Sequence, residues 1–151
     1  MKKLLLGIAA VCLAGFTFAQ DAPLWMRHSV ISPDGTTIAF TYKGDIYTVP
    51  VAGGRAMQIT TNPAYDTAPV WSPDSKRIAF ASDRMGSLDV YIVAKDGGEP
   101  RRLTTHSGSE TPLAFTDAGH VLFSAGIMPS AEAVVFLSLI HISEPTRPEP
   151  I

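Results

Sequence analysis

Histidine is the residue of this 151-residue chain best suited to bind a metal ion. The four histidines are His28, His106, His120 and His141. A zinc site needs three or four convergent ligands, and none of these histidines has a second His, a Cys or paired acids at ligand spacing. The sequence therefore predicts no metal site and places the histidines on the surface or in loops.

No residue stands in a pattern typical of a nucleophile or a phosphate loop. The segment 107–109, Ser-Gly-Ser, follows His106 but lacks the Gly-x-Ser-x-Gly arrangement of a strained nucleophile elbow, so it is interpreted as a turn. The glycine pairs at 53–54 and 97–98 lack the spacing and the Lys of phosphate-binding loops. We predict no catalytic residue, no metal and no cofactor for this chain.

Several aspartates recur at nearly constant spacing along the chain. They form two series, Asp34, Asp74 and Asp117, and then Asp45 and Asp89. A catalytic pair would occur once, whereas recurrence indicates a structural task repeated in each unit. Because Asp side chains bond the backbone two residues on, we expect these residues to cap turns. The Asp-x-Asp-x-Asp pattern of a calcium loop is absent.

Aromatic residues recur in the same way and favour packing between repeats over peptide binding. These aromatic residues are Phe40, Tyr47, Trp71, Phe80 and Tyr91. Arg84 differs from them because it lies in the turn that is longer in the second copy than in the first. We expect Arg84 to have a role beyond packing.

Two sequence blocks occur twice. Residues 31–40 and 71–80 share six of ten positions at an offset of 40 residues, around a common Ser-Pro-Asp. The blocks 45–61 and 89–105 share Asp-x-Tyr, Gly-Gly and Thr-Thr at an offset of 44. The four additional residues must therefore lie between the two blocks of the second copy, in the turn 82–88. A weaker third copy, without the Pro, follows 43 residues later.

A period of 40 to 44 residues is typical of a four-stranded propeller blade. Ser-Pro-Asp is turn chemistry, and the alternation of Ile38, Phe40 and Tyr42 predicts a strand with one buried face. We predict an all-β fold, an incomplete β-propeller of about two and a half four-stranded blades, with repeats starting near residues 31, 71 and 115. Propellers close with typically four to eight blades, so this ring does not close by itself.

The chain begins with the features of a secretory signal peptide. Two lysines precede an apolar run, and Thr17-Phe18-Ala19 resembles a small-x-small cleavage site, which predicts cleavage after Ala19. The only cysteine, Cys12, lies within this leader, so the predicted mature chain has no thiol. We expect a periplasmic or secreted protein that has no membrane association after cleavage. A net charge of −2 without a basic block argues against a nucleic-acid partner.

These motifs resemble the amino-terminal propeller of tricorn-type serine peptidases. The resemblance rests on Leu-Trp-Met-Arg before the first repeat, on the Tyr-Lys-Gly-Asp-Ile-Tyr segment and on the two Ser-Pro-Asp blocks. The blade motif alone resembles the wider WD40-like group, which includes TolB. The resemblance covers residues 20–136, the predicted partial propeller. The tail, 137–151, resembles a translated sequencing adapter and is predicted to be non-native or disordered, with a Pro-rich linker as the alternative.

The resemblance implies the function. The chain would be a non-catalytic, gating or filtering propeller fragment of an exported serine peptidase, with peptides or proteins as partners and with further blades and the catalytic domain elsewhere in the parent protein. By itself the chain would not be an enzyme. The alternative is a TolB-like periplasmic protein-binding propeller without enzymatic activity. A third possibility, a ring assembled from separate copies, would require edge strands to pair between subunits.

Overall fold

A computed structural model describes residues 25–126 and 134–139 of the chain. All its regular elements are β-strands, so the prediction of an all-β fold is confirmed. The predicted signal peptide and most of the predicted tail lie outside the described residues. Within those residues, no helix is long and apolar enough to cross a membrane.

The strands form three antiparallel sheets. The first contains β1 (Arg27–Ile31), β2 (Thr37–Tyr42), β3 (Asp45–Pro50) and β4 (Met57–Gln58) in chain order. The second contains β5 (Asp66–Trp71), β6 (Arg77–Ser82), β7 (Asp89–Ala94) and β8 (Arg101–Arg102). The third contains β9 (Glu110–Asp117), β10 (His120–Ala125) and β11 (Val134–Leu139). Each sheet is one blade, and the predicted incomplete propeller is confirmed.

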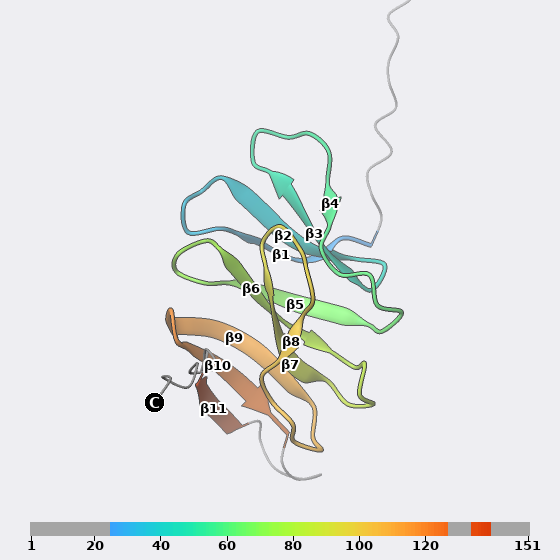
Figure 1. Cartoon of the computed structure of the whole chain (residues 1–151), viewed down its shortest axis with the longest axis vertical. Helices are drawn as coiled ribbons and strands as arrows, with labels where there is room; N and C mark the ends of the chain where they lie inside the picture. The colour runs from blue at the N-terminus through green and yellow to red at the C-terminus, as the bar shows by residue number, and fades with distance from the viewer. Residues whose placement is uncertain (1–24, 127–133, 140–151) are drawn as a thin grey trace, which may run out of the picture.

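The blades stack face to face in chain order (Figure 1). Their first strands lie next to one another, with β1 against β5 and β5 against β9. Each blade begins a few residues before the repeat motif, because Ser-Pro-Asp forms the turn that joins the first and second strands. Corresponding bulges interrupt β1 between Arg27 and Val30 and β5 between Thr67 and Val70. The repeated sequence thus produces repeated backbone geometry, irregularities included.

The apolar core lies between the blades. One cluster joins Ala39, Ile46 and Ile59 of the first blade to residues of the second blade, including Trp71 and Phe80. A second cluster joins the opposite face of the second blade to β10 and β11. The recurring aromatics stack in pairs within each blade, as Phe40 on Tyr47, Phe80 on Tyr91 and Phe123 on Phe136. The expected packing between blades is confirmed for Trp71, Phe80 and Tyr91, which lie in the cluster between the first two blades, whereas Phe40 and Tyr47 stack on each other within the first blade.

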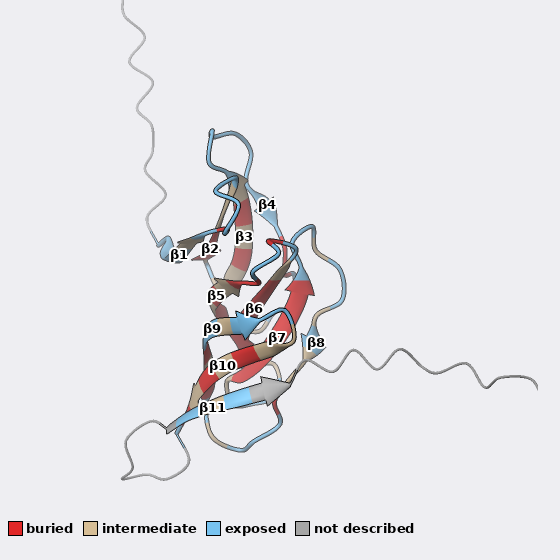
Figure 2. Ribbon diagram, turned by 90° about the vertical axis from the view of Figure 1, so that its left-hand side faces the viewer, coloured by how far each residue is buried: buried red, intermediate tan, exposed pale blue. Residues whose placement is uncertain are grey.

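The central blade differs from the prediction of one buried face per strand. In β6 the five residues from Ile78 to Ser82 are all buried, and the corresponding strand β2 also buries both Ala39 and Phe40 (Figure 2). The reason for β6 is that the central blade has a neighbouring blade on each face, so both faces of this strand become interior. The alternation of apolar and polar residues along a strand does not reveal that a second blade covers its other face.

Candidate functional site

The turn aspartates lie where the sequence placed them. Asp34 Oδ1 accepts hydrogen bonds from the Ser32 hydroxyl and the Thr36 backbone N–H, and Asp74 repeats this arrangement in the second blade. Asp117 accepts from the Gly119 N–H. Hydrogen bonds lower the pKa of all three carboxyls, and the largest cause is the serine hydroxyl for Asp34 and Asp74 and the His120 side chain, followed by the Gly119 N–H, for Asp117. The capping role of this series is confirmed.

Asp45 and Asp89 do not cap turns, which corrects the prediction for the second series. Each begins the third strand of its blade, and its carboxylate contacts a side chain of the outermost strand. Gln58 Nε2 donates to Asp45 Oδ2 at 3.0 Å, and Arg102 Nη2 lies 2.8 Å from Asp89 Oδ2. Gln58 and Arg102 are 44 residues apart and occupy the same position in successive blades. The structural role of these aspartates recurs once per blade, as predicted, but it consists of joining the third strand of the blade to the fourth.

A second acid faces each of these aspartates from the next blade. Asp66 begins β5 and is fully buried, and Glu110 begins β9 at the corresponding place and is only 3% exposed. The charge of Asp66 is among the causes that raise the pKa of Asp45, and the charge of Asp89 acts in the same way on Glu110. Each blade junction therefore contains two carboxyl groups from different blades.

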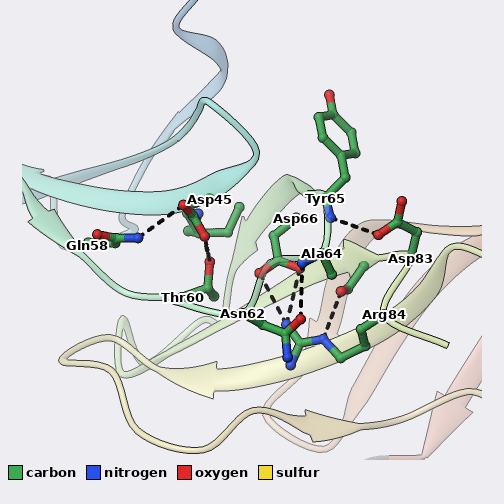
Figure 3. A network of polar contacts seen from close by, with 11 residues as sticks. Asp45, Gln58, Thr60, Asn62, Ala64, Tyr65, Asp66, Asp83 and Arg84 are labelled. Carbon is green, nitrogen blue, oxygen red and sulfur yellow. Dashed lines mark hydrogen bonds and ion pairs between the residues drawn. The ribbon is translucent and has the colours of Figure 1, made fainter.

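At each junction one arginine forms an ion pair with one of the two acids. At the first, Arg84 Nη2 lies 3.1 Å from both oxygens of Asp66 and Arg84 Nε donates to Ser82 Oγ at 2.8 Å (Figure 3). The Arg84 guanidinium also lies 4.4 Å from the ring centroid of Tyr91. At the second junction the arginine is Arg102, which pairs with Asp89 rather than with the acid of the next blade.

The acid without an arginine has a raised pKa at both junctions. Burial is the largest cause for Asp45 and for Glu110, and the neighbouring carboxylate adds to it. Hydrogen bonds from Thr60 and Thr104 act in the opposite direction. The hydroxyls of the same two threonines accept the backbone N–H groups of Ile46 and Val90. The junctions are therefore structural networks in which burial and a neighbouring carboxylate raise the pKa of one carboxyl.

A polar pocket of about 260 Å³ lies beside the first junction. Arg84 reaches it, together with Thr60, Asn62 and Glu99. Arg84 contacts Asp66, Ser82 and Tyr91 within its own blade, and its role beyond packing stays a prediction. Sequence reasoning missed Asp66 and Glu110 as a pair, although both are acids 44 residues apart and each stands 21 residues after Asp45 or Asp89.

The histidines do not converge within the described residues. His28 Nδ1 lies 3.1 Å from Thr67 Oγ1, His106 accepts from the Gly108 N–H, and His120 lies against Asp117. His141 lies outside the described residues. In the part of the chain that the structure describes, no three His, Cys, Asp or Glu residues are grouped for a metal ion.

Comparison with known proteins gives one family for nearly the whole predicted mature chain. Residues 23–147 match the tricorn protease N-terminal beta propeller domain. Tricorn protease homolog 1 of Streptomyces coelicolor is 35% identical over 102 residues, which are 67% of this chain and 9% of that protein. The uncharacterized peptidase YuxL of Bacillus subtilis is 30% identical over 129 residues, 84% of this chain and 20% of that protein.

The similarity to solved structures concerns the fold. The structure of putative TolB from Agrobacterium tumefaciens superposes with a TM-score of 0.62 at 24% identity, over 71% of this chain and 43% of that one. The chain thus spans less than half the length of each of these relatives. These relatives are named as a tricorn protease homolog, a peptidase and a putative TolB.

Proposed function

Because the chain belongs to the family of tricorn protease N-terminal β-propeller domains, we propose that it is the non-catalytic propeller portion of an exported tricorn-like serine peptidase. In this proposal the propeller filters peptides for a catalytic domain located elsewhere in the parent protein. Two relatives named as a tricorn protease homolog and a peptidase support the assignment.

The observation that carries the filtering role is an apolar hollow where the first strands of the three blades meet. It has a volume of about 430 Å³, and Ile31, Trp71, Leu113 and Phe115 are among the residues that line it. Ile31 and Leu113 are 54% and 46% exposed, so apolar side chains remain accessible along the innermost strands. A surface of this kind selects extended peptides by shape and apolar character, without taking part in bond cleavage.

The exported location is part of the same proposal. It rests on the lysine-led apolar segment and the small-x-small pattern of residues 1–19. Amino-terminal sequencing of the protein from a periplasmic extract would test it. Recovery of a chain that begins at Gln20 supports export, and a cytoplasmic chain that retains Met1 contradicts it.

The first experiment on the parent protein is long-read sequencing of the gene across codons 136–151. The proposal expects a frame that continues into further blades and a serine peptidase domain. A frame that continues into blades alone would favour the TolB-like binding module. A stop codon after Ile151 would contradict the peptidase assignment.

The filtering role is tested in the longer protein with Leu113→Arg, which places a charge in the hollow. We expect cleavage of long apolar peptides to fall at least fivefold while turnover of a minimal fluorogenic substrate is unchanged. Val51→Arg is the matched control, because Val51 is exposed to a similar extent, 47%, but lies outside the hollow. Equal effects of both variants on long peptides would contradict a filter at this position.

A further inference from the structure

A second hollow is separate from the apolar hollow where the first strands of the three blades meet. It lies at the end of the blades where the β2–β3 turn meets the segment before β5. It has a volume of about 310 Å³ and is lined by Trp25, Arg27, Thr41, Lys43, Gly44 and Tyr65. This volume is at the lower end of the range for ligand pockets, which suits one or two side chains of a larger ligand. This hollow is called the Trp25 pocket below.

Two aromatic side chains of the Trp25 pocket are open to solvent. Trp25 is 69% exposed and Tyr65 is 43% exposed. They stand 40 residues apart, each before the first strand of its blade, so the repeat places one aromatic on the first blade and one on the second. Core packing does not explain them, because the aromatics of the blade interfaces are buried or half-buried.

The backbone around Tyr65 is held firmly. The Tyr65 N–H donates to Asp83 Oδ1 at 2.7 Å (Figure 3). The Asp66 N–H donates to the Gly44 carbonyl at 2.7 Å. The second bond joins the β2–β3 turn of the first blade to the beginning of the second. These bonds fix the Lys43–Gly44 turn relative to Tyr65, so the pocket is formed before any ligand arrives.

The charged side chains of the Trp25 pocket are both cationic. Arg27 lies 5.9 Å from the ring centroid of Trp25, and Lys43 lies 5.3 Å from that of Tyr42. Neither forms an ion pair with any residue in the ranges 25–126 and 134–139. Two cations without an ion-pair partner thus stand beside two exposed aromatic side chains. A ligand of complementary chemistry would carry an anion attached to an apolar group.

We propose that the Trp25 pocket binds acidic peptide segments, in which a Glu or Asp side chain stands beside an apolar or aromatic residue. The carboxylate would lie between Arg27 and Lys43, and the apolar neighbour would lie against Trp25 and Tyr65. A single carboxylate matches two isolated cations better than a nucleic acid does, since nucleic acids require an extended basic surface. The proposal rests on the proposed function only in that the ligand is a peptide.

The test uses the 151-residue chain labelled with 5-fluorotryptophan. The chain contains two tryptophans, of which Trp25 lines the pocket and Trp71, 7% exposed, lines the apolar hollow of the proposed function, so the ¹⁹F spectrum distinguishes binding at the two hollows. A Trp25→Phe variant assigns the two resonances. The probes are an Ala-Phe-Glu-Ala tetrapeptide blocked at both ends and its Ala-Phe-Gln-Ala counterpart.

We expect the Glu peptide to shift the Trp25 resonance in a saturable manner while the Trp71 resonance is unchanged. Arg27→Gln and Lys43→Gln should each raise the Kd about two- to fivefold, the range for an exposed ion pair, and added salt should have the same effect. Lys76→Gln, which changes the charge equally at an exposed turn outside the pocket, should leave the Kd unchanged.

Three results would overturn the proposal. They are the absence of a Trp25 shift, equal binding of the Gln peptide, and equal weakening by Lys76→Gln. Failure of the proposed function is a separate outcome, because the measurement requires no catalytic domain. A parent protein without peptidase activity whose Trp25 pocket still binds the Glu peptide would remove the peptidase assignment and retain the site.

Discussion

Arg84 and Asp66 form a buried ion pair in which the guanidinium Nη2 contacts both carboxylate oxygens at 3.1 Å. The Asp66 side chain is fully buried and that of Arg84 is 12% exposed. Arg84 comes from the turn that is four residues longer in the second blade than in the first, where only Lys43 and Gly44 separate β2 from β3. The insertion therefore supplies the counter-charge for an acid that the first blade does not contain.

Removing Arg84 should destabilise the fold strongly. Arg84→Met leaves Asp66 charged and buried without a partner, a change that costs about 3–5 kcal/mol in the free energy of unfolding. Urea denaturation followed by circular dichroism measures the loss. The double variant Arg84→Met, Asp66→Asn should recover a large part of it, because no buried charge remains. If the double variant is less stable than the single one, loss of the ion pair does not explain the destabilisation by Arg84→Met.

Neutralising Glu110 should stabilise the protein near neutral pH. Burial and the charge of Asp89 raise the pKa of Glu110 above its ordinary value of 4.5, so the folded state favours the protonated carboxyl. Such a group weakens folding at pH values above its folded pKa, and the penalty disappears as the pH falls through that pKa. Glu110→Gln should therefore raise the urea midpoint at pH 7 and have less effect near pH 4.

The control for this prediction is Glu99→Gln, at an exposed position. It removes the same charge from a side chain that is not buried, so its urea midpoint should stay close to that of the parent at both pH values. A larger gain from Glu99→Gln than from Glu110→Gln would mean that net charge, rather than the junction, governs stability.

The turn carboxylates should have the opposite pH dependence. The pKa of Asp74 is lowered from 3.8, first by the Ser72 hydroxyl and then by the Lys76 N–H. Its stabilisation is fully present above the unfolded pKa and is lost as the pH falls below about 3.8 and through the folded pKa. Asp74→Ala should lower the free energy of unfolding by about 1 kcal/mol at pH 7 and have little effect at pH 2. An equal loss at both pH values would contradict the capping role.

The central blade should be the least tolerant of truncated side chains. Ile78 is fully buried between blades, so Ile78→Ala should cost about 2–5 kcal/mol in the free energy of unfolding. Ile31 is 54% exposed, and Ile31→Ala should cost less than about 0.5 kcal/mol. Urea midpoints of the two variants measured side by side check the difference. Similar losses at both positions would show that the blades do not stack as described.

Much of the fold follows from local signals in the repeats. The Ser-Pro-Asp segments specify the turn that joins the first two strands, and the longer turn 82–88 was recognised from the change of offset between 40 and 44 residues. The recurrence of Phe80 and Tyr91 at the repeat period indicated packing between blades, and both lie in the cluster that joins the first two blades. The turns depend on residues close together in one blade, where the sequence order fixes which groups can meet.

The sequence by itself determined the repeat length, the strands, the turn aspartates and the family resemblance. Only the tertiary structure decided which acids face each other, which of them has an arginine, and that Trp25 and Tyr65 line one hollow with two cations. The facing acids and the Trp25 pocket join residues of different blades, and the arginine pairs join different parts of one blade. The energies of all these relations depend on burial and on distances that no local pattern encodes. Stacking the blades removes water from the junctions, and the loss of water is what makes a second carboxylate costly and a nearby arginine necessary.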